Sequence, residues 1–425
     1  MNASDGGGKR VVQLLLLAVA VWGVTYARFA LGPLQEAMRL NLLLSDNAMA
    51  WLQGAALAVP MALGAIPFGI LVDRCSRARL FPLFTSMSLV ATALSAWAPS
   101  LAVLFAARAV AGLALAAVLV SAYSIVADLY PPAQRGRATM LVAVGEIAGA
   151  PAAFALGGML LTMHARGPED WRTALLWMST ALVPVVVLMF AVREPARTGL
   201  VVRSPALRDV WFELWQFRGV LVPLFLARTM VWVSDGAVLT WAAPAFARRY
   251  KLPSDRIGAM LGLILLISGL LGPVLGGPVA DLCQRTGGPR RTAAALGLLA
   301  LLCVPASFFA IMPSATSASW LLGALLTLGY TIGTAAITLG TIVIPGEVRG
   351  LYLALTITLA AFFFIGLAPL AVSGLAGELG GPEKINAALA VVCTTTSILG
   401  AAIFFFTRRY FPMPVRSGTM IQSAS

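Results

Sequence analysis

A long apolar run ends at the stretch Gly69-Ile-Leu-Val-Asp73-Arg74-Cys-Ser-Arg77. A second apolar run ends at a similar stretch, Gly277-Pro-Val-Ala-Asp281-Leu-Cys-Gln-Arg285. The dipeptides Arg135-Gly136 and Arg349-Gly350 recur at nearly the same offset from these two stretches. The sequence therefore predicts one helical membrane unit that is present twice. Internal duplication of this kind is typical of membrane transporters.

Composition sets the class of protein. The chain is 60% hydrophobic and only 11% charged, with a mean hydropathy of +0.89, which excludes a soluble globular domain. Because about 20 apolar residues cross a bilayer as a helix, we predict an all-α integral membrane protein with twelve transmembrane helices in two pseudo-symmetric six-helix bundles. The predicted spans are 11–33, 48–72, 80–98, 101–128, 139–163, 172–192, 220–244, 256–280, 290–312, 316–344, 350–376 and 385–407.

The spacing of these spans divides the chain into four parts. Residues 1–192 form the N-terminal bundle, 193–219 a cytoplasmic linker, 220–410 the C-terminal bundle and 411–425 a cytoplasmic tail. In the linker, Ser204-Pro205 favours a helix start, and apolar residues then recur at helical spacing, which predicts an amphipathic helix on the membrane surface. A plain tether between the bundles is the alternative.

The basic residues predict the orientation. Most of the 30 lysines and arginines fall in the loops on one side of the predicted spans, and such residues gather on the cytoplasmic side. We therefore expect a multi-pass protein of the cell (inner) membrane with both termini in the cytoplasm. The net charge of +13 follows from this topology and requires no nucleic acid as partner.

The sequence contains no recognisable pattern of catalytic residues. The only lysines are Lys9, Lys251 and Lys384, and none completes a phosphate-binding Gly-x-x-x-x-Gly-Lys loop. The single histidine, His164, and the four scattered cysteines give no metal-binding or disulfide pattern. We expect no enzyme activity, no catalytic residue, no cofactor and no metal, so that any transport would be driven by a gradient.

Ionisable residues within a membrane span are costly and are therefore candidate functional residues. Arg28, Arg108 and Asp235 are predicted to lie at one depth, in an outer tier with two arginines and one acid. Since a guanidinium binds carboxylate or phosphate, an anionic group is the expected ligand of this tier. The predicted aromatic neighbours in this substrate site are Tyr26, Trp232 and Tyr330.

Glu146 and Arg228 are predicted to form a second, inner tier about 10–15 Å nearer the cytoplasm. Together with Asp235 they are the candidate residues for coupling transport to an ion. Buried ion pairs that only stabilise the fold are the alternative for all five charged residues.

The duplicated stretches also suggest gates. Asp73 lies at a helix end, and Arg77 can reach Asp128 after the fourth span. A charge at a helix terminus is worth up to about 1 kcal/mol, which biases a two-state gate. Asp281 and Arg285, with Glu347 and Arg349, would form the matching gate of the second half. The alternative is that the arginines only fix the topology.

The phrase Gly-x-x-x-Asp-Arg-x-x-Arg at residues 69–77 resembles the signature of the major facilitator superfamily. Tyr26-Ala-Arg28-Phe-Ala-Leu-Gly-Pro33-Leu, Leu44-Ser-Asp46 and Ser121-Ala-Tyr-Ser-Ile-Val-Ala-Asp128-Leu-Tyr-Pro131 resemble its Spinster branch. This resemblance implies a secondary transporter that works by alternating access on an amphipathic lipid in the bilayer, such as a lysophospholipid or a sphingoid phosphate. A monomer is expected.

Two positions depart from the Spinster pattern. The branch usually carries an Asp before the first-span arginine and a Glu seven residues after the fourth-span arginine, where this chain has Ala27 and Leu115. Protons are therefore only one candidate for the coupling ion. A proton-coupled exporter that binds organic cations through Glu146 and Asp235 is the alternative transport function. A receptor or scaffold that transports nothing is the alternative from another class.

Overall fold

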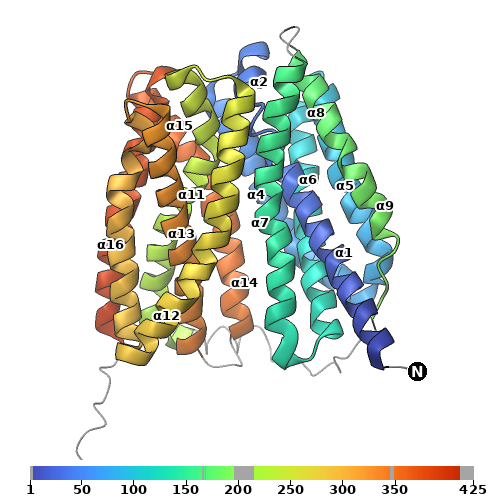
Figure 1. The fold of residues 1–425 in the computed structure, drawn as a ribbon, viewed down its shortest axis with the longest axis vertical. Helices are drawn as coiled ribbons and strands as arrows, with labels where there is room; N and C mark the ends of the chain where they lie inside the picture. The colour runs from blue at the N-terminus through green and yellow to red at the C-terminus, as the bar shows by residue number, and fades with distance from the viewer. Residues whose placement is uncertain (1–2, 165–166, 168, 196–214, 345–348, 412–425) are drawn as a thin grey trace, which may run out of the picture.

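The computed structural model describes residues 3–164, 167, 169–195, 215–344 and 349–411 (Figure 1). These residues are almost entirely helical. The helices of the first half are α1 (Ala3–Phe29), α2 (Gln35–Asn41), α3 (Asp46–Gln53), α4 (Ala55–Arg74), α5 (Arg77–Trp97), α6 (Leu101–Leu129), α7 (Pro132–Met163), α8 (Asp170–Thr180) and α9 (Leu182–Met189). Those of the second half are α11 (Arg218–Tyr250), α12 (Ser254–Ala306), η1 (Ser307–Ile311), α13 (Ala315–Val343), α14 (Arg349–Ala360), η2 (Ala361–Leu367), α15 (Ala368–Glu378), η3 (Pro382–Lys384), α16 (Ile385–Thr407) and η4 (Arg408–Tyr410).

Eleven helical segments of the described chain are long and apolar enough to cross a membrane, and one of them is long enough to cross it twice. The segment Ser254–Ile311 has 58 residues, which is roughly 87 Å of helix, almost three times the hydrocarbon thickness. It bends at Gly288, whose φ of 65° is a conformation that glycine adopts without strain. The predicted twelve spans in two bundles are confirmed.

Two spans are less regular than the sequence predicts. The second span consists of α3 and α4, which meet at Gly54, and the eleventh contains η2, a π-helix. A Cβ atom at Gly54 would lie 2.9 Å from the carbonyl oxygen of Gly366, so glycine lets the second span approach η2 closely. π-Helical turns are rare and often mark functional sites.

The two bundles lie side by side, the first in blue to green and the second in yellow to red (Figure 1). They meet along two seams: α7 packs against α12, and α3 and α4 pack against η2 and α15. In the first seam, a Cβ atom at Gly158 would lie 2.9 Å from the Cα atom of Gly258. Small residues that face each other in this way let two membrane helices pack closely.

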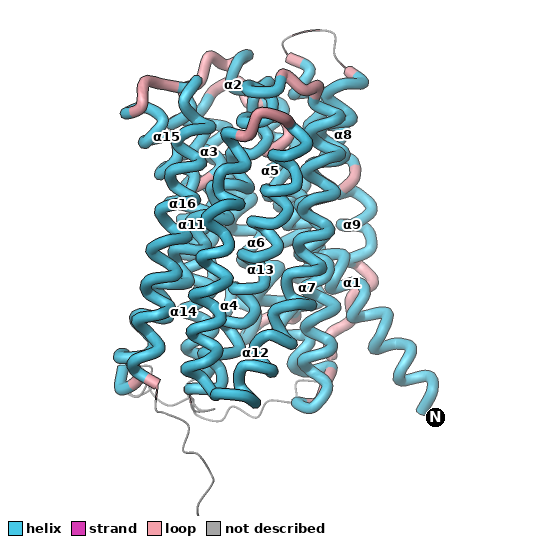
Figure 2. The backbone as a smooth tube through the Cα atoms, turned by 60° about the vertical axis from the view of Figure 1, so that its left-hand side comes forward, coloured by secondary structure: helices cyan, strands magenta, loops and turns pink. Residues whose placement is uncertain are grey.

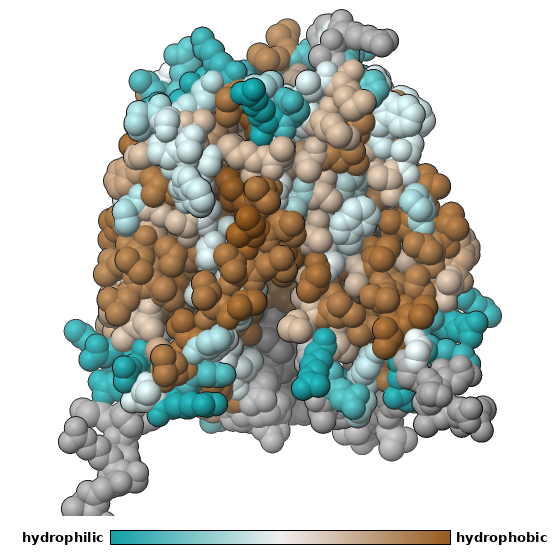
Figure 3. Space-filling model, in the orientation of Figure 1, coloured by the Kyte–Doolittle hydropathy of each residue, from teal (hydrophilic) through white to brown (hydrophobic). Residues whose placement is uncertain are grey.

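The face of the molecule in Figure 3 has brown apolar residues across its middle and teal polar residues at both ends, as a membrane-spanning protein requires. The helices run between these ends, and α2 covers the upper end (Figure 2). The predicted amphipathic helix of the linker, and the tail after Phe411, lie outside the described residues.

Candidate functional site

A cavity of about 660 Å³ lies between the two bundles. Its size is that of a site for a small organic molecule. The surface is hollowed between the two halves at the lower end, where the N-terminus lies (Figure 3). Most of the wall is apolar and comes from both halves, including Phe29, Met61, Leu119, Ile147, Leu265, Ile357 and Phe364.

Four charged residues interrupt this apolar wall. Arg28 and Glu146 come from the first bundle, and Arg228 and Asp235 come from the second. The predicted aromatic neighbours Trp232 and Tyr330 also line the cavity. Among the described residues, no three His, Cys, Asp or Glu side chains gather into a possible metal site.

Arg28 connects the two bundles at the cavity. Its guanidinium carbon lies 4.5 Å from the ring centre of Phe29 and 5.2 Å from that of Phe364, which belongs to η2. Glu146 on α7 is exposed to the cavity and lies near enough for its charge to act on Arg28. The acid and the two aromatic rings together stabilise the guanidinium in this position.

The two charged residues of α11 are buried, but in different surroundings. Arg228 is 5% exposed and lies 4.5 Å from the ring centre of Trp232. Asp235 is 4% exposed and packs against Gly329, where any side chain would collide with its carboxylate. Neither residue forms an ion pair with another side chain that the structure describes.

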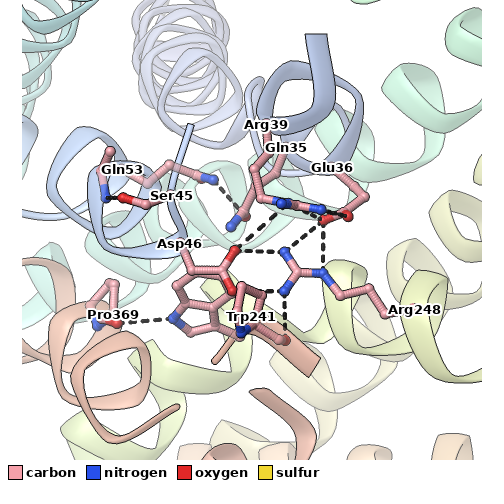
Figure 4. A network of polar contacts seen from close by, with 11 residues as sticks. Gln35, Glu36, Arg39, Ser45, Asp46, Gln53, Trp241, Arg248 and Pro369 are labelled. Carbon is pink, nitrogen blue, oxygen red and sulfur yellow. Dashed lines mark hydrogen bonds and ion pairs between the residues drawn. The ribbon is translucent and has the colours of Figure 1, made fainter. Parts of the chain in front are cut away.

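The upper end of the cavity is closed by a charged network between the bundles (Figure 4). Arg248 at the end of α11 donates to both oxygens of Asp46, at 2.7 Å each, and to Glu36 at 2.8 Å. Arg39 lies beside them, 2.7 Å from Glu36. We call Glu36, Asp46 and Arg248 the outer latch. Burial acts to raise the pKa of Glu36, but hydrogen bonds and charges from Arg39 and Arg248 outweigh it and hold that pKa below its ordinary value.

Further contacts join the bundles at the same end. The hydroxyl of Ser373 on α15 donates to Asn47 on α3 at 3.4 Å, and the backbone N–H of Asp255 on α12 donates to Thr162 on α7 at 3.1 Å. Among the described residues, all side-chain hydrogen bonds between the two bundles lie here. These contacts hold the upper end of the cavity closed, and Figure 3 shows the hollow between the two halves at the lower end.

At the lower end, Arg77 is the centre of a charged cluster within the first bundle. Its Nη1 lies 2.6 Å from Asp128 and donates to Ser124 at 2.9 Å, and its Nε donates to Glu194 at 2.8 Å. Glu194 also accepts from the backbone N–H of Ala78. Burial acts to raise the pKa of Glu194, but this hydrogen bond and Arg77 lower it further than burial raises it.

The sequence matches the Major Facilitator Superfamily over residues 17–369. The chain belongs to the Major Facilitator Superfamily. Its members are transporters rather than enzymes, and the layout of twelve helices in two bundles fits this superfamily. As a member of this superfamily, the protein is an integral membrane transporter by family and fold.

Two solved structures similar to this superfamily member are those of a bacterial homologue of the human lysosomal transporter Spinster, in inward-facing conformations. The unoccupied form has a TM-score of 0.80 at 18% identity and covers 95% of this chain and 97% of its own, and the occupied form has 0.79 at 20%, covering 94% and 96%. The nucleoside transporter NupG has a TM-score of 0.73 at 11% identity, covering 93% and 99%. At such identities the likeness shows the fold.

Among curated proteins, a putative niacin/nicotinamide transporter of Bacillus subtilis (strain 168) is 28% identical over 213 residues. The match spans 48% of this chain and about half, 50%, of the length of that relative.

Two of the predicted substrate residues do not line the cavity of this superfamily member. Tyr26 is fully buried and its hydroxyl donates to the carbonyl of Met178 at 3.2 Å. Since Tyr26 and Arg28 are two positions apart on a helix, about 200° separate their side chains, and only Arg28 faces the cavity. This spacing could have excluded Tyr26 from the sequence alone.

Arg108 is 3% exposed and also lies outside the lining. Its guanidinium donates to the carbonyl oxygens of Arg28 at 2.8 Å and Ala27 at 3.5 Å, near the end of α1. The first cavity residue of α6 is Ala116, and Arg108 precedes it by about 12 Å along the helix axis. Arg108 therefore lies nearer the closed upper end. In this structure Arg108 therefore holds the end of α1 in place and lies outside the cavity lining.

The two predicted tiers of charge are also corrected, because Glu146 is a neighbour of Arg28. Helix α7 begins at Pro132, which places Glu146 about 21 Å along it, and not roughly 15 Å. Helix α1 runs obliquely (Figure 1), so the number of residues along it overstates the height that it gains across the membrane.

Within the residues that it describes, the structure shows the predicted contact for one of the two gates and not for the other. Arg77 does reach Asp128, and Glu194 joins this pair although the sequence analysis gave it no role. The side chain of Asp73 lies outside the described part, as do Glu347 and the side chain of Arg349. Asp281 and Arg285 are both exposed, and no ion pair between them is present among the described residues.

Proposed function

We propose that this protein is a secondary transporter that moves an amphipathic, anionic substrate by alternating access. The observation that carries the proposal is the cavity between the bundles, which the outer latch closes at one end while the other end is hollow. Alternating access requires this arrangement, with a central site that is reached from one side at a time.

The cavity chemistry supports the substrate class. Long apolar walls suit an acyl or aromatic part, and Arg28 and Arg228 suit a carboxylate or phosphate. A lysophospholipid or a sphingoid phosphate has both parts. The fold shared with the Spinster homologue agrees with a lipid, although the fold alone names no substrate.

A small aromatic carboxylate is the second candidate. It is favoured by the partial similarity to the putative niacin/nicotinamide transporter, and it would use the same arginines. The acids Glu146 and Asp235 leave the exporter of organic cations as the alternative with opposite charge.

The proposed location is the cell (inner) membrane, with both termini and the cavity mouth in the cytoplasm. Exposed basic residues at the ends of α4, α5 and α7 support it, because such residues accumulate on the cytoplasmic side. They are Arg74, Arg79, Arg135 and Arg137.

The test is flux in liposomes that contain the purified full-length protein. Four probes are compared: a lysophosphatidate, a monoacylglycerol with the same chain, nicotinate and tetraphenylphosphonium. We expect flux of the lysophosphatidate above that of the neutral analogue. Preferential flux of tetraphenylphosphonium would establish the cation exporter, and absence of flux for every probe would favour a receptor or scaffold.

A reversible lock provides the matched control. Asn47 and Ser373 contact each other across the bundles, so Asn47→Cys with Ser373→Cys should form a disulfide that holds the outer end closed. The native cysteines, Cys75, Cys283, Cys303 and Cys393, are replaced first. Flux should stop on oxidation and return on reduction. Equal flux in both states would contradict alternating access.

A further inference from the structure

Arg228 is a buried cation in the cavity wall that still has hydrogen-bond donors without partners. It is 5% exposed, and its Nε and Nη1 have no hydrogen-bond partner. Leaving such donors unsatisfied in a buried site is unfavourable, and more so when the group is charged. Arg228 nevertheless lines the cavity, so its buried donors lie directly behind the wall that a ligand would contact.

The surroundings of Arg228 fix the guanidinium without neutralising it. Its plane lies over Trp232, and the hydroxyl of Tyr352 forms a hydrogen bond with it. Tyr352 is itself 1% exposed, and its hydroxyl occupies the space that a side chain at Gly340 would need. Asp235 lies two turns away on the same helix, about 10 Å along the axis.

The other two arginines near the cavity are already occupied. Arg28 has Glu146 as a neighbouring opposite charge and two aromatic rings against it. Arg108 donates to carbonyl oxygens of α1. Within the described part of the chain, Arg228 is the cavity arginine with no acidic partner.

We propose that Arg228, held by Trp232 and Tyr352, is the subsite for the anionic group of the ligand. This inference rests on the proposed function and deepens it, because it assigns the headgroup to the second bundle. A phosphate or a carboxylate would accept hydrogen bonds from the donors of Arg228 that have no partner. The apolar part of the ligand would contact the apolar wall, which includes Phe29 and Ile357. The phosphate could belong to a lysolipid and the carboxylate to a small aromatic acid.

The test measures binding to the purified full-length protein, so that it does not depend on transport. The probes are an oleoyl lysophosphatidate, mono-oleoylglycerol as its neutral match, and nicotinate. Arg228→Gln should weaken the lysophosphatidate about 10- to 100-fold and leave mono-oleoylglycerol nearly unchanged. Arg228→Lys, which keeps the charge but not the planar fork, should fall between the two. Loss of nicotinate affinity in Arg228→Gln would identify the carboxylate as a second ligand of the same subsite.

Arg218→Gln is the matched control. It removes one positive charge from the same helix, at an exposed position about 15 Å away. It should leave all affinities unchanged. Equal weakening of the anionic and neutral lipids in Arg228→Gln, or no weakening of any anion, would overturn the subsite.

The subsite and the proposed function fail in different ways. If Arg228→Gln loses the anion selectively while the wild type shows no flux in liposomes, the subsite stands and the transporter proposal fails. If the wild type transports lysophosphatidate and Arg228→Gln binds and transports it equally well, transport stands and the subsite fails. Should Arg228→Gln not fold, the ratio of anionic to neutral affinity in Arg228→Lys decides, because an unchanged ratio overturns the subsite.

Discussion

Arg248 of the second bundle donates to both carboxylate oxygens of Asp46 of the first bundle, at 2.7 Å each. Two parallel hydrogen bonds from one guanidinium are among the strongest polar contacts in proteins. Both side chains are largely buried, with 15% and 6% exposure. The pair therefore holds the outer end of the cavity shut.

We expect Arg248→Gln to open that end. Loss of the pair should cost the closed state about 2 kcal/mol, or roughly a 30-fold change in the ratio of closed to open molecules. Labelling of Leu239→Cys by an impermeant maleimide from the outer side measures this. The control is Arg249→Gln, since Arg249 binds carbonyls of its own bundle. Equal labelling rates in both variants would contradict the prediction.

Acid should open the same latch. The closed state holds the pKa of Glu36 below its ordinary value of 4.5, so closure favours the ionised form. The contribution of Glu36 is therefore fully present above pH 4.5 and is lost as the pH falls through the lowered value. A polarity-sensitive dye attached beforehand to Leu239→Cys should report entry of water in that range, and Glu36→Gln should remove this part of the pH dependence. An unaltered pH profile in Glu36→Gln would rule the residue out.

The glycine contact between α7 and α12 predicts a steric effect. A side chain at Gly158 would meet the backbone of Ser254 and Gly258, so Gly158→Val should prevent the outer end from closing. Gly277→Val is the control, because nothing lies within 4 Å of a Cβ atom there. Outer labelling should increase only in the first variant. If both variants label like the parent, the seam tolerates separation.

Arg77→Gln should destabilise the first bundle. It leaves Asp128 and Glu194 without their shared cation, and loss of one partner of a largely buried ion pair costs about 3 kcal/mol. The melting temperature should fall by several degrees in thermal unfolding of the purified protein. Arg79→Gln, two residues further and exposed, should melt like the wild type. A similar melting temperature for both variants would mean that Arg77 contributes little.

The missing carboxylates predict weak proton coupling. Because Ala27 and Leu115 replace the acids of the Spinster pattern, flux should change little when a proton gradient is imposed. Glu146 is the acid near Arg28, so any remaining dependence should disappear in Glu146→Gln. Flux measured with and without the gradient checks this. A strict proton requirement that survives both Glu146→Gln and Asp235→Asn would refute the prediction.

The sequence predicts the spans well because each is an apolar run whose length alone decides that it crosses a bilayer. It predicts the cavity less well, since a residue's depth depends on helix tilt and on the first residue of the helix, as Arg28 and Glu146 illustrate. It does not predict the outer latch. Glu36 and Arg248 lie 212 positions apart, in regions where charges are common, and a single sequence gives no sign that they meet.

Both acids of the outer latch lie within one short stretch, Glu36 to Asp46, while the cavity draws its residues from helices spread over the whole chain. The acids of the outer latch are thus encoded apart from the cavity residues, whereas their partner Arg248 shares α11 with Arg228 and Asp235. Exchange of residues 35–46 with those of a relative would change the acids that Arg248 binds and leave the cavity wall untouched. Substitutions in this stretch can therefore change how firmly the outer end is held closed while every residue of the cavity wall stays the same.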